Sequence, residues 1–581
     1  MYLKRGFNKD TGRTYLSIAQ KYRDPETGKS KDRAVEKIGY LDEFKDKYKD
    51  PIAHFKEVAN EMTQREKEEK EITLTLSTEE EITDDTDDRK NYGYAAIMKI
   101  YHELLLHEHF KAKARYQKFK FNTNAIMLLL VISRILSPGS KKKAFEEKGR
   151  YFERFNFALE DIYRALSHFS VIGDETQKFL HTQISKKYGR DTSVVYFDAT
   201  NFYFEIDEQD DLRKRGVNKE HRPNPIVQMG LALDKDGIPI RYEIFPGNKH
   251  DSETFQSVVG EICKNYDAGR IIAVGDMGVI TNNNIWYLIG AKPHKPRHGY
   301  VFSYSVRKAK KDFKKYVLDD AGYVNSDGKP FEDGDGYKVK SRQTAREIKV
   351  TITRNGKETE VAKIVQEKQV IFWGQNYADK QKAEREAMIR KAHRFIKDPS
   401  KYKKHTGHGS AKYIQGIDKE TGEVDPKKIL SINWDLVAEE EKYDGYYAIV
   451  TSELYMPTDE VIDTYRGLWE IEETFGVAKG DLEARPIHVS RADRINAHML
   501  TCFIALVIVR LLQKKTGRVY TAEKIIYALN RVSCSRVKGN LYMFDFRSPV
   551  TNAISKATGI DFSKKFRRLG EMKKSLGAVK L

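Results

Sequence analysis

The sequence predicts an α/β fold in which strands and helices alternate along the catalytic part of the chain. Residues 193–205, SVVYFDATNFYFE, are rich in β-branched and aromatic residues and predict a strand. Residues 270–278, RIIAVGDMG, predict a short strand followed by a helix that Thr281 or Asn282 can cap. Residues 465–479, YRGLWEIEETFGVAK, predict a helix. Each segment contains a carboxylate, which is costly to bury unless it is paired or binds a cation.

The predicted helix around residues 465–479 has one apolar side. Its apolar residues recur at helical spacing, which favours burial of Val461, Ile462, Leu468, Trp469 and Phe475. Thr458 follows Pro457 and is the predicted N-terminal cap. Tyr465, Glu472 and Lys479 are seven residues apart, close to two turns, so they project from one side. The alternative is that Glu472 is one of several charges, with Glu470 and Glu473, on a solvated helix.

The two strand carboxylates favour a functional interpretation. Asp198 interrupts its strand between Phe197 and Ala199, where a charge needs a partner. Asp276 ends its apolar run, and ligand groups collect at such strand ends in open α/β sheets, although a turn or cap residue is the alternative. With Glu472, these carboxylates predict an all-oxygen site for hard divalent cations.

Composition limits the remaining possibilities. The 581 residues have a formal net charge of +18 and a pI near 9.2, which favours a polyanionic partner. The three cysteines lack CxxC spacing, which argues against a zinc site or disulfide framework and fits a reducing cytoplasm. The start lacks the apolar core of a signal peptide, and the apolar runs 126–136 and 499–512 contain arginines. We therefore expect a cytoplasmic protein without a membrane segment.

Basic residues gather in two further stretches. Residues 111–121, KAKARYQKFKF, interleave lysines with aromatic residues and predict a DNA-backbone surface that includes Lys111, Lys113 and Lys118. The alternative is a solvated loop. Residues 554–581 contain eight Lys or Arg against two acids, and predict either a DNA-binding tail or a frayed basic end.

The motifs around the three carboxylates resemble those of the DDE transposases of bacterial insertion sequences. The similarity covers YFDATNFYFE around Asp198, VGDMG around Asp276, the helix around Glu472, and residues 481–512 after it. The chain resembles the insertion-sequence-four-like subgroup with a Tyr-Arg-Glu-Lys signature, Y-x2-R-x3-E-x6-K. Tyr465, Glu472 and Lys479 fill three positions, but Leu468 stands where Arg is expected. Arg466 is nearby but points elsewhere on a straight helix.

This resemblance implies an RNase H-like catalytic core. Strand, hairpin, helix, strand, helix, strand is the expected order, and the 196 residues from Asp276 to Glu472 (472 − 276) exceed a loop within a compact domain. The expected regions are an N-terminal β-hairpin region, helix and acidic linker (1–90), a helical DNA-binding domain (91–190), the core in two parts (191–306 and 445–512), a mainly β inserted domain (307–444) and a basic C-terminal region (513–581).

The resemblance also implies an activity and a ligand set. Asp198, Asp276 and Glu472 would bind two Mg²⁺, with Mn²⁺ as a substitute, for cleavage at the inverted repeats of the element's ends and joining to target DNA. Tyr465 and Lys479 would contact DNA, and Trp373 would approach a flipped base unless it is a core residue. Two protomers would pair the ends at the bacterial nucleoid. The alternatives are an RNase H-like nuclease or junction resolvase without strand transfer, and a catalytically silent DNA-binding repressor.

Overall fold

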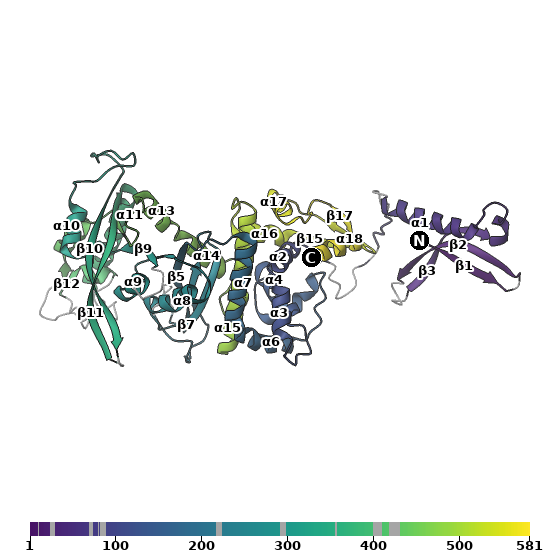
Figure 1. Ribbon diagram of the computed structural model, residues 1–581, viewed down its shortest axis with the longest axis horizontal. Coiled ribbons are helices and arrows are strands. Elements are labelled where there is room, and N and C mark those ends of the chain that lie inside the picture. The colour runs from purple at the N-terminus through teal and green to yellow at the C-terminus, as the bar shows by residue number, and fades with distance from the viewer. Residues whose placement is uncertain are drawn as a thin grey trace. The chain divides into compact units, whose positions relative to one another are not determined.

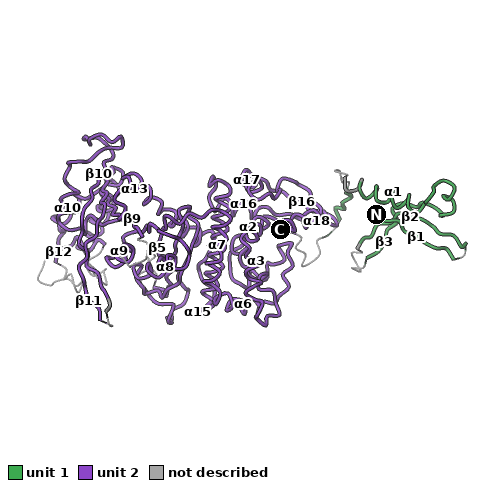
Figure 2. The backbone as a smooth tube through the Cα atoms, in the orientation of Figure 1, with its two compact units in different colours: residues 1–87 green, residues 88–581 purple. Residues whose placement is uncertain are grey.

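The computed structural model describes residues 1–9, 11–23, 30–68, 74–79, 81, 89–216, 223–290, 298–354, 357–398, 409–416 and 430–580. The chain forms two compact units, Met1–Asp87 and Asp88–Leu581 (Figure 2). Most of the predicted acidic linker, residues 79–88, lies outside the described residues, as does the predicted turn at 24–28.

The N-terminal unit is a three-stranded antiparallel sheet with one helix (Figure 1). Its elements are β1 (Tyr2–Asn8), β2 (Arg13–Arg23), β3 (Ser30–Tyr40), η1 (Leu41–Phe44) and α1 (Pro51–Glu68). Leu16 and Ile18 alternate along β2 and are fully buried, so one face of the sheet forms the small core of this unit. The predicted short strands and charged helix are confirmed.

The second unit is built on an eight-stranded sheet in the order β10-β11-β14-β9-β8-β5-β6-β7. The five strands predicted for the core are β5 (Val194–Tyr203), β6 (Ile226–Leu233), β7 (Pro239–Pro246), β8 (Ile272–Gly275) and β9 (Gly299–Tyr304). β5, β6 and β7 are antiparallel neighbours, whereas β8 runs parallel to both β5 and β9. The predicted hairpin is formed by β6 and β7. Its turn is the sequence Lys235-Asp236-Gly237, typical of a tight turn, and Gly237 has a φ of +66° there. This is the RNase H-like arrangement that the sequence predicted.

Helices cover both faces of this sheet. Val195 and Phe197 of β5 pack against Phe255 of α8 (Asp251–Asn265) and Ile285 of α9 (Asn282–Ile289). The intervening Tyr196 belongs to a second cluster with Leu468 and residues of α13 (Thr458–Arg466), α14 (Trp469–Lys479) and α15 (Ala492–Lys515). Because side chains alternate along a strand, α13, α14 and α15 lie on the opposite face from α8 and α9.

The predicted insertion extends the sheet of the core. β14 (Tyr446–Thr451) pairs with β9 on one side and with β11 (Lys357–Gly374) on the other, and β11 pairs along its length with β10 (Tyr337–Arg354). Residues 307–444 therefore contribute two strands, β10 and β11, to the sheet of the core. They also contain helices α10 (Lys311–Leu318), α11 (Gln375–Lys397) and α12 (Trp434–Glu441), besides η4 (Gly409–Tyr413), β12 (Ile414–Gln415) and β13 (Ser431–Ile432). The pairing of β11 with β14 joins distant segments, which sequence patterns do not reveal.

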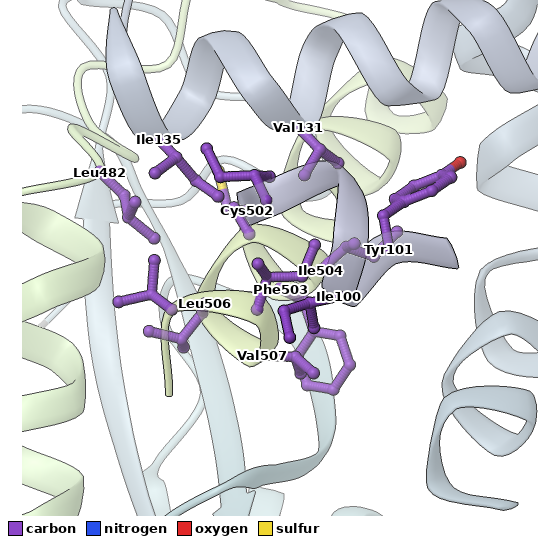
Figure 3. Close-up of a cluster of buried hydrophobic side chains, with 14 of the residues drawn as sticks. Ile100, Tyr101, Val131, Ile135, Leu482, Cys502, Phe503, Ile504, Leu506 and Val507 are labelled. Carbon is purple, nitrogen blue, oxygen red and sulfur yellow. The ribbon is translucent and has the colours of Figure 1, made fainter. Parts of the chain in front are cut away.

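A helical region surrounds α15. It consists of α2 (Tyr94–Glu103), α3 (Leu106–Ala114), α4 (Thr123–Leu136), α5 (Lys141–Glu146), η2 (Glu147–Arg150), α6 (Leu159–Val171) and α7 (Gly173–Tyr188). Figure 3 shows Phe503 and Val507 of α15 among Ile100 of α2 and Val131 of α4. α15 is longer than the predicted apolar run and is apolar enough to cross a membrane, but 94% of its most apolar window is buried inside the protein. It is the central core helix of this unit.

The C-terminal region is folded. Its elements are α16 (Ala522–Arg531), β15 (Ser533–Lys538), β16 (Leu541–Phe544), α17 (Pro549–Thr558), β17 (Phe566–Arg568) and α18 (Leu569–Val579). β15, β16 and β17 form a four-stranded sheet with β4 (Arg89–Asn91), so the two ends of this unit are joined by backbone hydrogen bonds. The expectation of a frayed basic end is wrong, because Ile554, Met572 and Leu576 are buried between the charges.

We predict that α18 contributes to the stability of the unit. Met572 is fully buried, and Met572→Ala should lower the free energy of unfolding by about 2–5 kcal/mol. The adjacent Lys573 is exposed, and Lys573→Ala should change it by no more than about 0.5 kcal/mol. Urea denaturation of both variants is the measurement. Equal stabilities would mean that α18 is only loosely attached.

Candidate active site

Asp198 and Asp276 occupy neighbouring positions on adjacent parallel strands. The pairing of β5 with β8 matches Tyr196 with Val274, and two more residues along each strand bring Asp198 opposite Asp276. Adjacent strands lie about 4.8 Å apart, so the two backbones hold these aspartates side by side. Asp198 is half-buried, whereas Asp276 follows the last residue of β8 and is exposed.

Both aspartates lie on the sheet face that α13 and α14 cover. Tyr196 and Val274 belong to the core cluster on that face. Asp198 and Asp276 each lie two residues further along the same strands, so they point to the same face. The pairing of β8 with β9 continues to bring Asp276 opposite Ser303. The Ser303 hydroxyl donates a hydrogen bond of 2.8 Å to Oδ1 of Asp276, which is consistent with this register.

The Asp276 carboxylate is held through one of its two oxygens. Besides Ser303, Oδ1 accepts the Met277 N–H at 2.6 Å and the Tyr465 hydroxyl at 3.5 Å. Among the described residues, no partner of Oδ2 is found. Asp276 is therefore oriented by Oδ1 and keeps Oδ2 available as a ligand.

Tyr465 links α13 to the sheet. Its hydroxyl lies 2.6 Å from that of Tyr447 on β14. Burial, followed by the neighbouring Tyr447, raises the pKa of Tyr465 well above its ordinary value, and burial also raises the pKa of Tyr447. Both phenols therefore stay protonated at neutral pH, so Tyr465 can donate to Asp276. The family resemblance implies a DNA contact for Tyr465. In the structure its side chain is half-buried, and its hydroxyl also donates to Asp276 at 3.5 Å.

The segment predicted as one helix is divided into α13 and α14 at Gly467–Leu468. The N–H groups of Leu468 and Glu470 bond to carbonyls three residues back, at 3.0 and 3.1 Å, so the chain tightens there. Glycine is required at this position, because a Cβ on Gly467 would lie only 2.0 Å from the Tyr196 hydroxyl oxygen. The predicted Thr458 cap is wrong, since Pro457 occupies the cap position and Thr458 begins the helix.

α14 runs along β5 in the direction that carries Glu472 toward Asp198. It starts where Gly467 meets Tyr196, and near its end the Lys479 ammonium lies 5.7 Å from the centre of the Phe202 ring. Five helical residues from Gly467 to Glu472 advance about 7.5 Å. Two strand residues from Tyr196 to Asp198 advance about 6.6 Å. Glu472 therefore lies level with Asp198.

The neighbouring acids of α14 have structural partners. Glu473 is 3.0 Å from the Arg510 guanidinium, and Glu470 is 2.7 Å from that of Arg518. Glu472 is exposed, and among the described residues it has no hydrogen-bond or ion-pair partner. The alternative in which these acids form one solvated row is therefore wrong for Glu470 and Glu473.

The oxygen ligands and the backbone positions of the three carboxylates suit a site for hard cations. The three carboxylates come from β5, from the end of β8 and from α14, and oxygen ligands are those that Mg²⁺ prefers. Within the described residues, no three His, Cys, Asp or Glu side chains lie close enough together to hold one metal ion. Binding a shared ion thus requires these side chains to turn inward from the positions that the backbone gives them.

Arg510 holds α14 from its far side. This buried guanidinium donates to the Thr474 hydroxyl at 3.1 Å, to the Glu473 carboxylate at 3.0 Å and to the Glu470 carbonyl at 3.3 Å. Sequence patterns did not single out Arg510, Tyr447 or Ser303. An arginine within the apolar run 499–512 was visible, but its partners lie on another helix.

Leu468, which stands where the family signature has Arg, is part of the hydrophobic core. Leu468 is 8% exposed, which confirms the predicted burial, whereas the predicted burial of Trp469 is wrong at 56% exposure. Arg466 is exposed and pairs with Asp463 of the same helix at 3.4 Å. Its ion-pair partner therefore lies on α13 itself.

The other residues predicted to contact DNA lie on or next to α3 and on β11. Lys111 and Lys118 are exposed near the end of α3, and Lys113 pairs with Glu175. Trp373 is half-buried at the end of β11, and its indole N–H donates to the Asp444 carbonyl at 2.9 Å. These contacts favour the core role of Trp373 over a base contact.

Comparison with known protein families identifies the family to which the chain belongs. The transposase DDE domain matches residues 189–508, more than half of the chain. The N-terminal domain of the IS1634 family transposases matches residues 3–78. The chain therefore belongs to the DDE transposases of insertion sequences. A search of curated proteins found no match. Family membership implies DNA binding, and such enzymes generally depend on divalent metal ions.

We predict that Arg510 is the main support of α14. Arg510→Met removes charge-assisted hydrogen bonds to three groups, and should lower the free energy of unfolding by about 1.5–3 kcal/mol. Arg518→Met breaks a more exposed pair with the same helix, and should cost at most about 1 kcal/mol. Thermal and urea denaturation compare the two. Similar losses for both would contradict this assignment.

Proposed function

We propose that this transposase cuts DNA at the ends of its element and joins those ends to target DNA, with Asp198, Asp276 and Glu472 as metal ligands. The proposal is supported by the register of β5 and β8, which brings Asp198 level with Asp276, and by the course of α14 along β5, which brings Glu472 to the same level. Membership of the family supports the reaction class.

The residues around the carboxylates have separate tasks. Divalent cations, when bound, supply an activated water and stabilise the charge on the leaving oxygen. Asp198 and Glu472 would hold the ions from β5 and α14, and Asp276 would do so through Oδ2 while Ser303 and Tyr465 orient its Oδ1. Mg²⁺ is the expected ion, and Mn²⁺ offers similar coordination to oxygen ligands.

The substrate strand would pass beside the end of α14. Lys479 projects from the same side of the helix as Glu472, two turns away, and its ammonium lies over β5. It is therefore placed to contact a phosphate next to the one being cleaved. Water attacks the phosphodiester first and releases a 3′-OH, which then attacks a target phosphodiester in the same site. A dimer would bring two ends together for this second step.

The test replaces one carboxylate at a time. Asp198→Asn, Asp276→Asn and Glu472→Gln should each abolish nicking of a duplex that contains the element's end in Mg²⁺, because each removes one ligand charge and keeps the shape. Binding of the same duplex in a mobility shift should persist. Glu460→Gln, which removes an exposed carboxylate from α13, is the matched control and should cut normally.

Several outcomes would contradict the proposal. Normal cutting by any of the three variants would remove that residue from the site. Nicking without joining of a pre-cut end to a target plasmid would instead favour a nuclease or resolvase. Binding without any nicking by the wild-type chain would favour a repressor.

A further inference from the structure

Among the described residues of the N-terminal unit, one face of the sheet has no helix packed on it. Along β2, Leu16 and Ile18 are fully buried on one face, and the helix α1 contributes the buried Ala59 to this small core. Ser17 and Ala19 point to the other face, where Ser17 is half-buried and Ala19 is buried beneath its neighbours on the sheet. On this open face lie Lys4 of β1, Lys21 of β2 and Lys37 of β3, and all three lysines are exposed.

Three of the residues on the open face form a row across the sheet. Strand pairing places Lys4 opposite Ser17, and Ser17 opposite Lys37. A small hydroxyl residue therefore stands at the centre, with one lysine on each outer strand. Next to this row, Lys4 pairs with Asp32 at 3.0 Å, and the two side chains are 50% and 30% exposed. Such an exposed pair is weak and exchanges readily for a phosphate.

Charge is divided between the two sides of this unit. Residues 1–40, which include the three strands, contain ten Lys or Arg and five Asp or Glu, a formal charge of +5. Residues 41–68, which include η1 and α1, contain six Lys or Arg and eight Asp or Glu, a formal charge of −2. A polyanion is therefore attracted to the sheet side and repelled from the helix side.

We propose that the open face of β1, β2 and β3 docks into the major groove of duplex DNA. The outer strands of a three-stranded sheet are about 9.6 Å apart, which fits a major groove about 12 Å wide. In this position Lys4 and Lys37 meet the phosphates on the two sides of the groove, and Ser17 faces the base edges. The inference rests on the proposed function for the presence of a DNA partner, and adds the surface that binds it.

The experiment measures binding of the full-length chain to a duplex from the DNA that flanks the reading frame. Lys4→Gln/Lys37→Gln should weaken binding and reduce the slope of log affinity against log salt by about 1.8, since each lost phosphate contact removes about 0.9. Lys49→Gln/Lys56→Gln removes the same charge from the helix side and should leave the slope unchanged. Lys4→Arg/Lys37→Arg keeps the charge and should bind as the wild type does.

Chemical interference then identifies the groove. Methylation of guanine N7, which lies in the major groove, should block binding by the wild type at discrete positions. The Lys4→Gln/Lys37→Gln variant should lose those positions. Blocking by methylation in the minor groove alone, or an unchanged salt slope, would overturn the proposal and leave the lysines as protection of the sheet edges against aggregation.

A further control separates this inference from the proposed function. Asp276→Asn should keep both the mobility shift and the interference pattern while it loses cutting. Normal binding by the lysine variant, together with lost cutting by Asp276→Asn, would refute only the docking surface. Lost binding by the lysine variant, with normal cutting by Asp276→Asn, would refute only the assignment of the carboxylates.

Discussion

The pairing of β5 with β8 is the interaction on which the proposed site depends. Parallel backbone hydrogen bonds fix the register at Tyr196 and Val274, and this register places Asp198 opposite Asp276. A slip of one residue would turn one aspartate to the face of α8 and α9. The same strand also sets the third carboxylate, because Tyr196 meets Gly467 where the chain enters α14. One strand thus determines the positions of two carboxylates and aligns the third.

Much of the core could be predicted because its signals are local. The run SVVYFDATNFYFE is a strand by composition, Lys235-Asp236-Gly237 is a turn by its glycine, and Thr281 caps α9 through the Asn284 N–H. The order of these elements predicts the five strands of the RNase H-like sheet. Asp198 and Asp276 stand out because a carboxylate is unusual at each of those positions.

Other features depend on contacts between distant segments. The close approach of Tyr196 to Gly467 joins β5 to the start of α14, and the pairing of β11 with β14 extends the sheet. Arg510 looked like an interruption of an apolar run, but it holds the carbonyl and side chains of α14. Residues 554–581 looked like a basic tail, since their buried residues are spaced among eight cationic ones. Local patterns do not encode such partners.

The central claim is that Asp198, Asp276 and Glu472 surround one metal site. Fe²⁺ can replace Mg²⁺ at such oxygen ligands, and with ascorbate it generates radicals that cut the nearby backbone. The claim predicts cuts at three places in the wild-type chain, beside residues 198, 276 and 472, all suppressed by excess Mg²⁺ and all lost in Asp276→Asn. Cuts at only one of these places, or cuts that Mg²⁺ does not suppress, would contradict it.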